Sequence, residues 1–197
     1  MKRPDLNPLL LFLTLLLACL PLMAQETEQP AEEPKLSRAQ TMGQPSAAHE
    51  KIMAREGTWR VKAQMTMADG QVIENSGIMQ SEASLDGRFL TSLFKGEFMG
   101  YPFLGRSVDG YDNETNKYVS LWFDNTSTQI VAYYGTSEDD GETITYFADT
   151  VDGETGEKVR LKSVHRAQSD SQHTVEEFRM SEGDEDWALT MRVISSR

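Results

Sequence analysis

From about residue 58 onward, hydrophobic and polar side chains alternate with a period of two, which is typical of β-strands. Clusters of Asp, Asn and Gly separate the alternating segments, as they do at the turns of antiparallel sheets. Because no helical segment interrupts the series, consecutive strands are expected to pair in an antiparallel meander. The pattern predicts ten strands, at residues 58–67, 71–81, 88–98, 103–111, 117–124, 129–136, 142–150, 158–166, 173–181 and 186–194.

A short helix is predicted before the first strand. Ser46 can cap it, residues 47–55 have helix-forming character, and Gly57 ends it. This is the one helix expected in the folded part of the chain.

The two faces of the predicted strand 117–124 indicate how the sheet is used. One face carries Tyr118, Ser120, Trp122 and Asp124, and the other face is apolar, so neither is plainly a solvent face. A barrel accommodates such a strand because its interior can hold polar groups around a cavity while other elements cover part of the outside. We therefore predict an all-β, up-and-down antiparallel barrel, with a two-sheet sandwich as the alternative.

Residues 1–24 have the layout of a secretory signal peptide, with basic residues before an apolar run at 9–17. That run is about half of the roughly 20 residues that cross a bilayer as a helix. Cleavage after Ala24 would give an exported protein, periplasmic or secreted. Cleavage before Cys19, in a sequence that resembles a lipoprotein box, would instead give an outer-membrane lipoprotein, and only then is a membrane an expected partner.

The rest of the chain divides into a linker and one domain. Residues 25–45 are acidic, contain prolines and have few large apolar side chains, so we predict a disordered linker. Residues 46–197 suffice for one β-barrel domain with a sizeable core. Because Cys19 is the only cysteine, no disulfide is expected. The net charge of −12 repels phosphate backbones, so nucleic acid is not an expected partner.

Gly57 and Trp59 open the first predicted strand after a short helix, and Arg192 lies in the last predicted strand. This arrangement resembles the lipocalins and fatty-acid-binding proteins, in whose barrels an arginine packs over the tryptophan and closes one end. The resemblance implies that Trp59 and Arg192 close one end of a lipocalin-like barrel here.

A longer series of motifs, spanning about residues 52–192, is similar to the domain-of-unknown-function family 1579. Asp86 stands where the family usually has glycine in its Leu-Gly-Gly-Arg turn, a change that turn geometry tolerates. The resemblance implies a lipocalin-like barrel with an unknown ligand. The motifs are Leu85-Asp86-Gly87-Arg88-Phe89-Leu90, Gly96-x-x-x-Gly100-x-Pro102-Phe103-x-Gly105, Gly110-Tyr111-Asp112-Asn113, Lys117-Tyr118-x-x-x-Trp122-x-Asp124-x-x-Ser127-Thr128, Gly135 and Thr155-Gly156.

A candidate ligand site follows from the inward faces of the predicted strands. Arg88 alternates with Leu90 and Ser92, so its guanidinium is expected inside the barrel, with Asp124 as a partner. An arginine there could bind a carboxylate or another anion on a largely apolar ligand. The predicted ligand-binding residues are Arg88, Tyr101, Phe103, Tyr111, Trp122, Asp124 and Tyr134.

We favour an extracytoplasmic barrel that binds a small, largely apolar and possibly anionic ligand; the alternative is a non-catalytic interaction protein with a self-filled core. No catalytic residue, metal ligand or cofactor is predicted, because the expected core has no cysteine nucleophile and no Gly-x-Ser-x-Gly elbow. His165 and His173 could be neighbours across a hairpin, which leaves a haem-binding barrel as a further alternative. Asp109 and Asp112 could form a carboxylate pair, which leaves a hydrolase or an isomerase as another.

Overall fold

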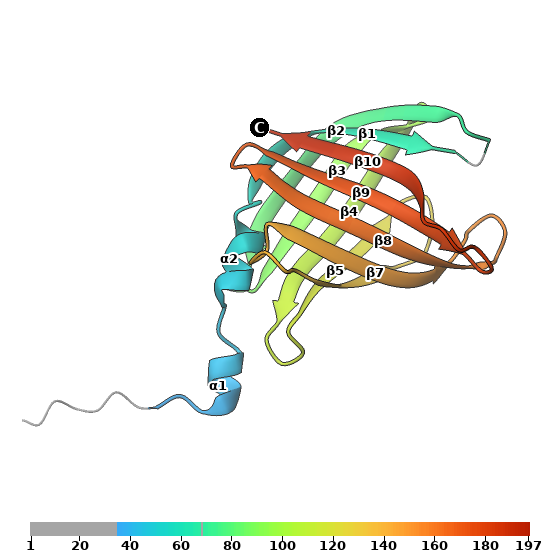
Figure 1. Cartoon of the computed structure of the whole chain (residues 1–197). Coiled ribbons are helices and arrows are strands. Elements are labelled where there is room, and N and C mark those ends of the chain that lie inside the picture. The colour runs from blue at the N-terminus through green and yellow to red at the C-terminus, as the bar shows by residue number, and fades with distance from the viewer. Residues whose placement is uncertain (1–34, 68) are drawn as a thin grey trace, which may run out of the picture. The chain divides into compact units, whose positions relative to one another are not determined.

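The structure, a computed structural model, describes residues 35–67 and 69–197 (Figure 1). The predicted signal peptide, Cys19 and residues 25–34 of the predicted linker lie outside the described residues. Neither described helix is long and apolar enough to cross a membrane. The elements are α1 (Arg38–Met42), α2 (Ala47–Met53), β1 (Gly57–Thr66), β2 (Val72–Ser84), β3 (Phe89–Phe98), β4 (Tyr101–Asp112), β5 (Lys117–Asp124), β6 (Val131–Thr136), β7 (Thr143–Val151), β8 (Lys158–Ser169), β9 (Gln172–Ser181) and β10 (Ala188–Ser196).

The strands form one closed barrel in which each strand pairs with its neighbours in the sequence. The barrel closes where β1 pairs with β10, with Val61 opposite Ser195 and Ala63 opposite Val193. Closure leaves no strand edge available for pairing with another chain. The predicted all-β antiparallel barrel is confirmed, and the sandwich alternative is wrong.

The strand bounds agree closely with the alternation in the sequence. β5 has the predicted bounds, whereas β2 continues to Ser84 and β8 continues to Ser169. These extensions pair with β3 and β9, a contact between strands that a local pattern does not report. Met99 and Gly100, at φ 51° and 81°, make the turn between β3 and β4, where a hairpin requires the left-handed region.

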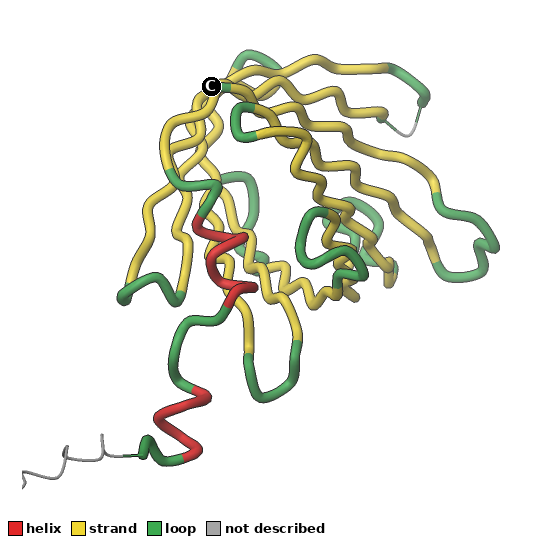
Figure 2. The backbone as a smooth tube through the Cα atoms, turned by 60° about the vertical axis from the view of Figure 1, so that its left-hand side comes forward, coloured by secondary structure: helices red, strands yellow, loops and turns green. Residues whose placement is uncertain are grey.

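A hydrophobic core fills the barrel end next to α2, which we call the helix end. Figures 1 and 2 both show α2 lying at this end, where it contacts β3 and β4. Ile52, in the last turn of α2, is 0% exposed, so the helix buries an apolar side chain against the strands. The core consists of Ile52, Leu90, Tyr118, Tyr133, Ile144, Tyr146 and Ala148.

Trp59 helps to close the helix end, and its indole N–H donates a hydrogen bond to the carbonyl of Arg55 at 2.8 Å. The guanidinium of Arg197 lies over the indole, with Cζ 4.4 Å from the ring centroid. An arginine therefore covers Trp59, but the assignment of this role to Arg192 is wrong. Arg192 bonds to Glu176 instead, because it lies on the outward face of β10.

α1 lies within the segment predicted to be a disordered linker. Ser37 and Gln40 form a capping box, in which each side chain accepts a hydrogen bond from the other residue's backbone N–H. The side chain of Asn113, in the turn after β4, donates to the carbonyl of Met42 at 2.8 Å. Local capping and contacts with this turn therefore order residues that composition alone assigned to the linker.

Candidate ligand-binding site

Away from the helix end, the inward-facing side chains of the barrel are only partly covered. Ala63 and Val175 face inward and are half-buried, and strand pairing fixes their orientation. Glu177 of β9 also faces inward, and its carboxyl accepts a hydrogen bond from the hydroxyl of Tyr133 of β6 at 2.9 Å. A tightly packed interior would cover side chains that point into a closed barrel, so the interior is not closely packed around Ala63 and Val175. We call this part of the interior the lumen.

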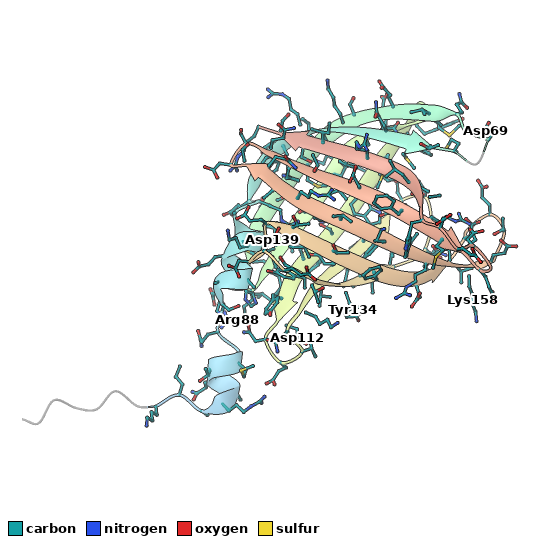
Figure 3. All side chains as sticks on the ribbon, viewed as in Figure 1. Asp69, Arg88, Asp112, Tyr134, Asp139 and Lys158 are labelled. Carbon is teal, nitrogen blue, oxygen red and sulfur yellow. The ribbon has the colours of Figure 1, made fainter. Side chains whose placement is uncertain are left out.

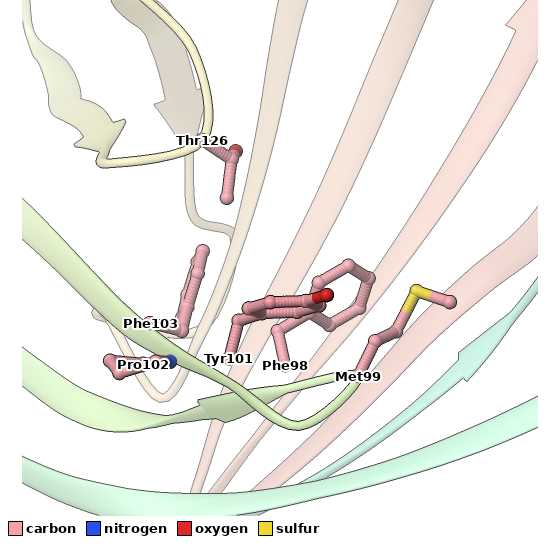
Figure 4. A pocket seen from close by; sticks show the side chains of 6 residues that line it. All are labelled: Phe98, Met99, Tyr101, Pro102, Phe103 and Thr126. Carbon is pink, nitrogen blue, oxygen red and sulfur yellow. The ribbon is translucent and has the colours of Figure 1, made fainter.

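A pocket of about 370 Å³ lies at the opposite end of the barrel from α2, which we call the open end. Figure 3 labels Asp69 and Lys158 at this end, and Figure 4 shows the pocket between the start of β4 and the loop after β5. Tyr101 is 75% exposed at its rim, while the Phe98 and Phe103 rings lie tilted by 52° to each other with centroids 6.2 Å apart. The lining residues are Phe98, Met99, Tyr101, Pro102, Phe103 and Thr126.

Trp122 extends this aromatic surface into the barrel. Its ring stacks with that of Phe103 at a centroid distance of 6.5 Å, and its indole N–H donates to Asp124 Oδ2 at 3.0 Å. Gly105 makes room for the ring, because a Cβ at this position would lie 2.4 Å from the indole. Asp124 therefore orients Trp122, and the predicted pairing of Asp124 with Arg88 is wrong.

Where the lumen meets the packed core, four side chains form what we call the polar cluster: Arg55, Tyr146, His165 and His173. Within the described part of the chain, each has a buried polar atom without a hydrogen-bond partner: Nη2 of Arg55, the hydroxyl of Tyr146 and Nδ1 of both histidines. The Tyr146 and His165 rings lie 4.9 Å apart, and His173 packs edge-on against Trp59 at 4.5 Å. Such atoms are rare in folded proteins because burial without a partner costs free energy.

Burial keeps the cluster's histidines neutral. Burial, reinforced by the nearby charge of Arg55, lowers the pKa of His165 to about 3 and that of His173 to about 4. Burial also raises the pKa of Tyr146, so its hydroxyl remains a hydrogen-bond donor at neutral pH. Arg55 makes no ion pair with any carboxylate of the described residues. The cluster therefore presents one unpaired cation among neutral polar groups.

The carboxyl groups of Glu177 and Asp109 also point into the barrel. Burial raises the pKa of Glu177, although the hydrogen bond from Tyr133 opposes this shift. Asp109 is 5% exposed and accepts a hydrogen bond from Ser107 at 3.0 Å. Asp112 instead bonds to the following turn, outside the barrel, so the expected pairing of Asp109 with Asp112 is wrong.

The described residues contain no group of three or more His, Cys, Asp or Glu side chains arranged to hold a metal ion. His165 and His173 both point into the barrel, as neighbours on β8 and β9. The Nε2 atom of His165 lies 3.1 Å from the Ser163 hydroxyl. One nitrogen of His165 is thus already engaged by the protein.

The predicted ligand-binding residues fall in four places. Phe103, Trp122 and Asp124 line the open end, and Tyr101 lies at its rim. Tyr111 packs at the helix end against Tyr118 and His49, with centroids 4.9 and 5.8 Å away. Tyr134 is 55% exposed on the outer surface, where Figure 3 labels it, because its neighbour Tyr133 takes the inward position. The remaining residue, Arg88, lies outside the lumen.

Arg88 lies in the turn before β3, beside α2 (Figure 3). Its guanidinium donates to the carbonyls of Gly43 at 3.0 Å and Leu85 at 3.1 Å. It borders a second pocket, of about 370 Å³, between residues 42–44 and the outer face of β3, β4 and β5. The expectation that Arg88 points into the barrel is wrong, because β3 begins only at Phe89 and the alternation does not extend into the turn.

Sequence reasoning missed Arg55, Tyr146 and Glu177 as residues of the interior. The alternation does place Tyr146 on the inward face of its strand, so this residue could have been found. Arg55 carries no such signal, because it was expected at the end of the helix and the structure places it after α2, outside the strand alternation. Only the packing of α2 on the barrel brings it to the lumen.

A family model described as a protein of unknown function (DUF1579) matches residues 44–197. The chain belongs to this family. The match includes α2 and all ten strands, and therefore every residue that lines the lumen. A comparison with curated proteins finds no match. The family resemblance noted from the motifs is thus confirmed, and the function has to be argued from the site itself.

Proposed function

We propose that this domain binds one small, largely apolar molecule inside the barrel, with access from the open end. The observation that carries the proposal is the lumen, bordered by half-buried inward residues such as Ala63 and Val175. A protein whose own side chains filled the barrel would bury these residues as fully as it buries Leu90, at 1% exposure. The lumen therefore favours a binding protein over an interaction protein with a filled core.

The lining at the open end supports an apolar ligand. Phe94, Phe103 and Trp122 form a continuous aromatic surface, with centroid distances of 5.8 and 6.5 Å between successive rings. Binding sites for small molecules are typically apolar surfaces with a few polar groups that orient the ligand. The buried polar atoms without a hydrogen-bond partner among the described residues lie deeper, at the polar cluster. This separation favours a ligand with an apolar body and one polar end.

The neutral dye Nile red, whose fluorescence increases in apolar surroundings, tests this function. We expect saturable binding with one site per chain. In the variant Val175→Trp, a large side chain enters the lumen and should weaken dye binding about tenfold or more, since it removes the space that the dye occupies.

Thr174→Trp is the matched control, because Thr174 neighbours Val175 and faces outward. This variant should bind the dye as the parent does. Binding that is absent from the parent, or that both variants weaken equally, would contradict a site in the lumen.

The sequence also predicts export, and we propose that the barrel meets its ligand outside the cytoplasm. The denatured mass of the mature protein from its own envelope fraction tests the processing. A chain that starts after Ala24 supports a soluble exported form, and a lipidated chain that starts at Cys19 supports an outer-membrane anchor. A mass that includes residues 1–24 would contradict export.

A further inference from the structure

We propose that the polar cluster is the binding site for a carboxylate group of the ligand, and that Arg55 is the residue that recognises it. The inference deepens the proposed function and rests on it. The ligand would then be an amphipathic acid, with its apolar body among the aromatic rings of the open end and its carboxylate at the inner end of the lumen.

The backbone holds Arg55 at the inner end of the lumen. α2 ends just before it, and the Arg55 backbone N–H donates to the carbonyl of Ile52 at 3.1 Å. The carbonyl of Arg55 accepts the indole hydrogen bond of Trp59, a residue that is 2% exposed. With the backbone fixed between a buried helix residue and a buried strand residue, the side chain extends into the barrel end, where Nη2 is buried.

The unused atoms of the cluster match the needs of a carboxylate. In the part of the chain that the structure describes, Nη2 of Arg55 and the hydroxyl of Tyr146 have no acceptor, although the Arg55 guanidinium lies close enough to the Tyr146 oxygen to lower the pKa of that hydroxyl, against the rise that burial causes. Each neutral histidine carries one N–H, and Nδ1 of both His165 and His173 is unused. A carboxylate has two oxygens that accept several hydrogen bonds, and a guanidinium presents N–H groups that match this geometry. One ligand group can therefore satisfy several buried atoms together.

The charge of Arg55 favours a negative charge at this place, although the buried carboxyl of Asp109 also lies near enough to Tyr146 to raise the pKa of its hydroxyl beyond the effect of burial. Arg55 has no ion-pair partner among the described carboxylates, whereas Arg179 at the other end pairs with Asp152. A buried charge is stable only when it is paired or hydrogen-bonded. Burial raises the pKa of Glu177, which favours its neutral form and reduces repulsion of an acid that passes along the lumen.

The length of the barrel sets the size of the ligand. Tyr118 of β5 pairs with Gly135 of β6, and Gly135 pairs with Tyr146 of β7, so Tyr118 and Tyr146 lie at the same height in the barrel. Trp122 lies four residues further along β5, nearer the open end. Four residues of strand span about 13 Å at roughly 3.3 Å per residue. An acid with a medium-length alkyl chain is long enough to reach from Trp122 to the polar cluster.

The test compares three ligands that share one alkyl chain: decanoate, decanol and decylamine. Each is titrated against Nile red bound to the parent protein at neutral pH. We expect decanoate to bind about tenfold or more tightly than decanol, as a charge-assisted hydrogen bond to a buried partner would produce, and decylamine to bind most weakly. Arg55→Met should remove the preference for decanoate and leave the affinity for decanol nearly unchanged.

Arg106→Met is the matched control, because Arg106 is exposed and faces outward on β4. It should keep the preference for the acid. Tyr146→Phe removes only a hydroxyl and should weaken decanoate but not decanol, so it decides the question if Arg55→Met does not fold. Arg88→Met tests the arginine that the sequence alone suggested.

The outcomes separate this inference from the proposed function. Equal affinities for all three ligands, tightest binding of decylamine, or a preference lost in Arg88→Met and kept in Arg55→Met would overturn the carboxylate site while leaving a binding barrel. If neither Nile red nor any of the three ligands binds, both proposals fail.

Discussion

The pKa values of His165 and His173 are set by the residues around them. Both lie inside the barrel, near the charged Arg55, and His173 also lies near Arg197, which covers Trp59. Their folded-state pKa values lie below the ordinary value of 6.5 because burial disfavours the imidazolium. The polar cluster is therefore held in its neutral form by the fold.

Because the pKa values of His165 and His173 are lower in the folded chain than in the unfolded chain, the free energy of unfolding depends on pH. Below pH 6.5 both histidines of the unfolded chain take up protons. In the folded chain His173 does so only near pH 4, and His165 only near pH 3. The histidine contribution is thus fully present above pH 6.5 and is lost as the pH falls to about 4 for His173 and to about 3 for His165. Each histidine contributes a slope of at most about 1.4 kcal/mol per pH unit.

Urea unfolding between pH 7 and pH 4 measures this slope. We expect the parent to lose stability faster than the double variant His165→Gln/His173→Gln as the pH falls. The carboxylates common to both proteins titrate equally, so the difference between the two slopes isolates the histidines. Parallel slopes would show that the two rings are protonated in the folded state or are accessible to water.

At the scale of elements, the two helices contribute differently to the fold. α1 has no buried residues and touches the rest of the described chain through polar contacts such as Arg38 with Glu114. α2 buries His49 and Ile52 on the barrel end. We infer that α2 contributes to the stability of the barrel and that α1 contributes little to it.

Two substitutions check this assignment. Ile52→Ala should lower the free energy of unfolding by about 2 to 5 kcal/mol, since it leaves a cavity where the side chain is fully buried. Arg38→Ala should leave the midpoint of unfolding unchanged, because exposed ion pairs contribute little. Thermal or urea unfolding measures both, and a large effect of Arg38→Ala would place α1 in the core of the fold.

At the scale of the whole molecule, the barrel has one closed end and one open end. Trp59 is covered by Arg197 at the helix end, whereas Trp122 is half-buried within the lumen near the open end. If the proposed ligand binds, this asymmetry gives it one route to the interior, with the polar cluster at the far end of that route.

Fluorescence quenching by acrylamide measures the difference in accessibility between the two ends of the barrel. Single-tryptophan variants, with the other two tryptophans replaced by phenylalanine, isolate Trp59 and Trp122. We expect the emission of Trp122 to be quenched several times more strongly than that of Trp59, because the quencher reaches the lumen but not the closed end. Equal quenching would contradict an open lumen, and decanol should protect Trp122 if the proposed ligand site is correct.

The prediction of the strands succeeded where the information is local. In β5, Tyr118, Ser120 and Trp122 alternate with apolar residues, and this pattern already separates the inward face from the outward face. The site was predicted only in part. Phe103 and Trp122 line the open end because the alternation placed them correctly, but Arg88 failed because the pattern was extended into a turn.

The sequence by itself determined the ten strands, their faces, the turns between them and the family of the chain, because these depend on residues a few positions apart. The tertiary structure decided which arginine covers Trp59 and which arginine reaches the lumen. Arg197 is brought to Trp59 from the far end of the chain, and Arg55 is brought to Tyr146 by the packing of α2. Both contacts depend on tertiary packing, which brings together residues that no local pattern connects.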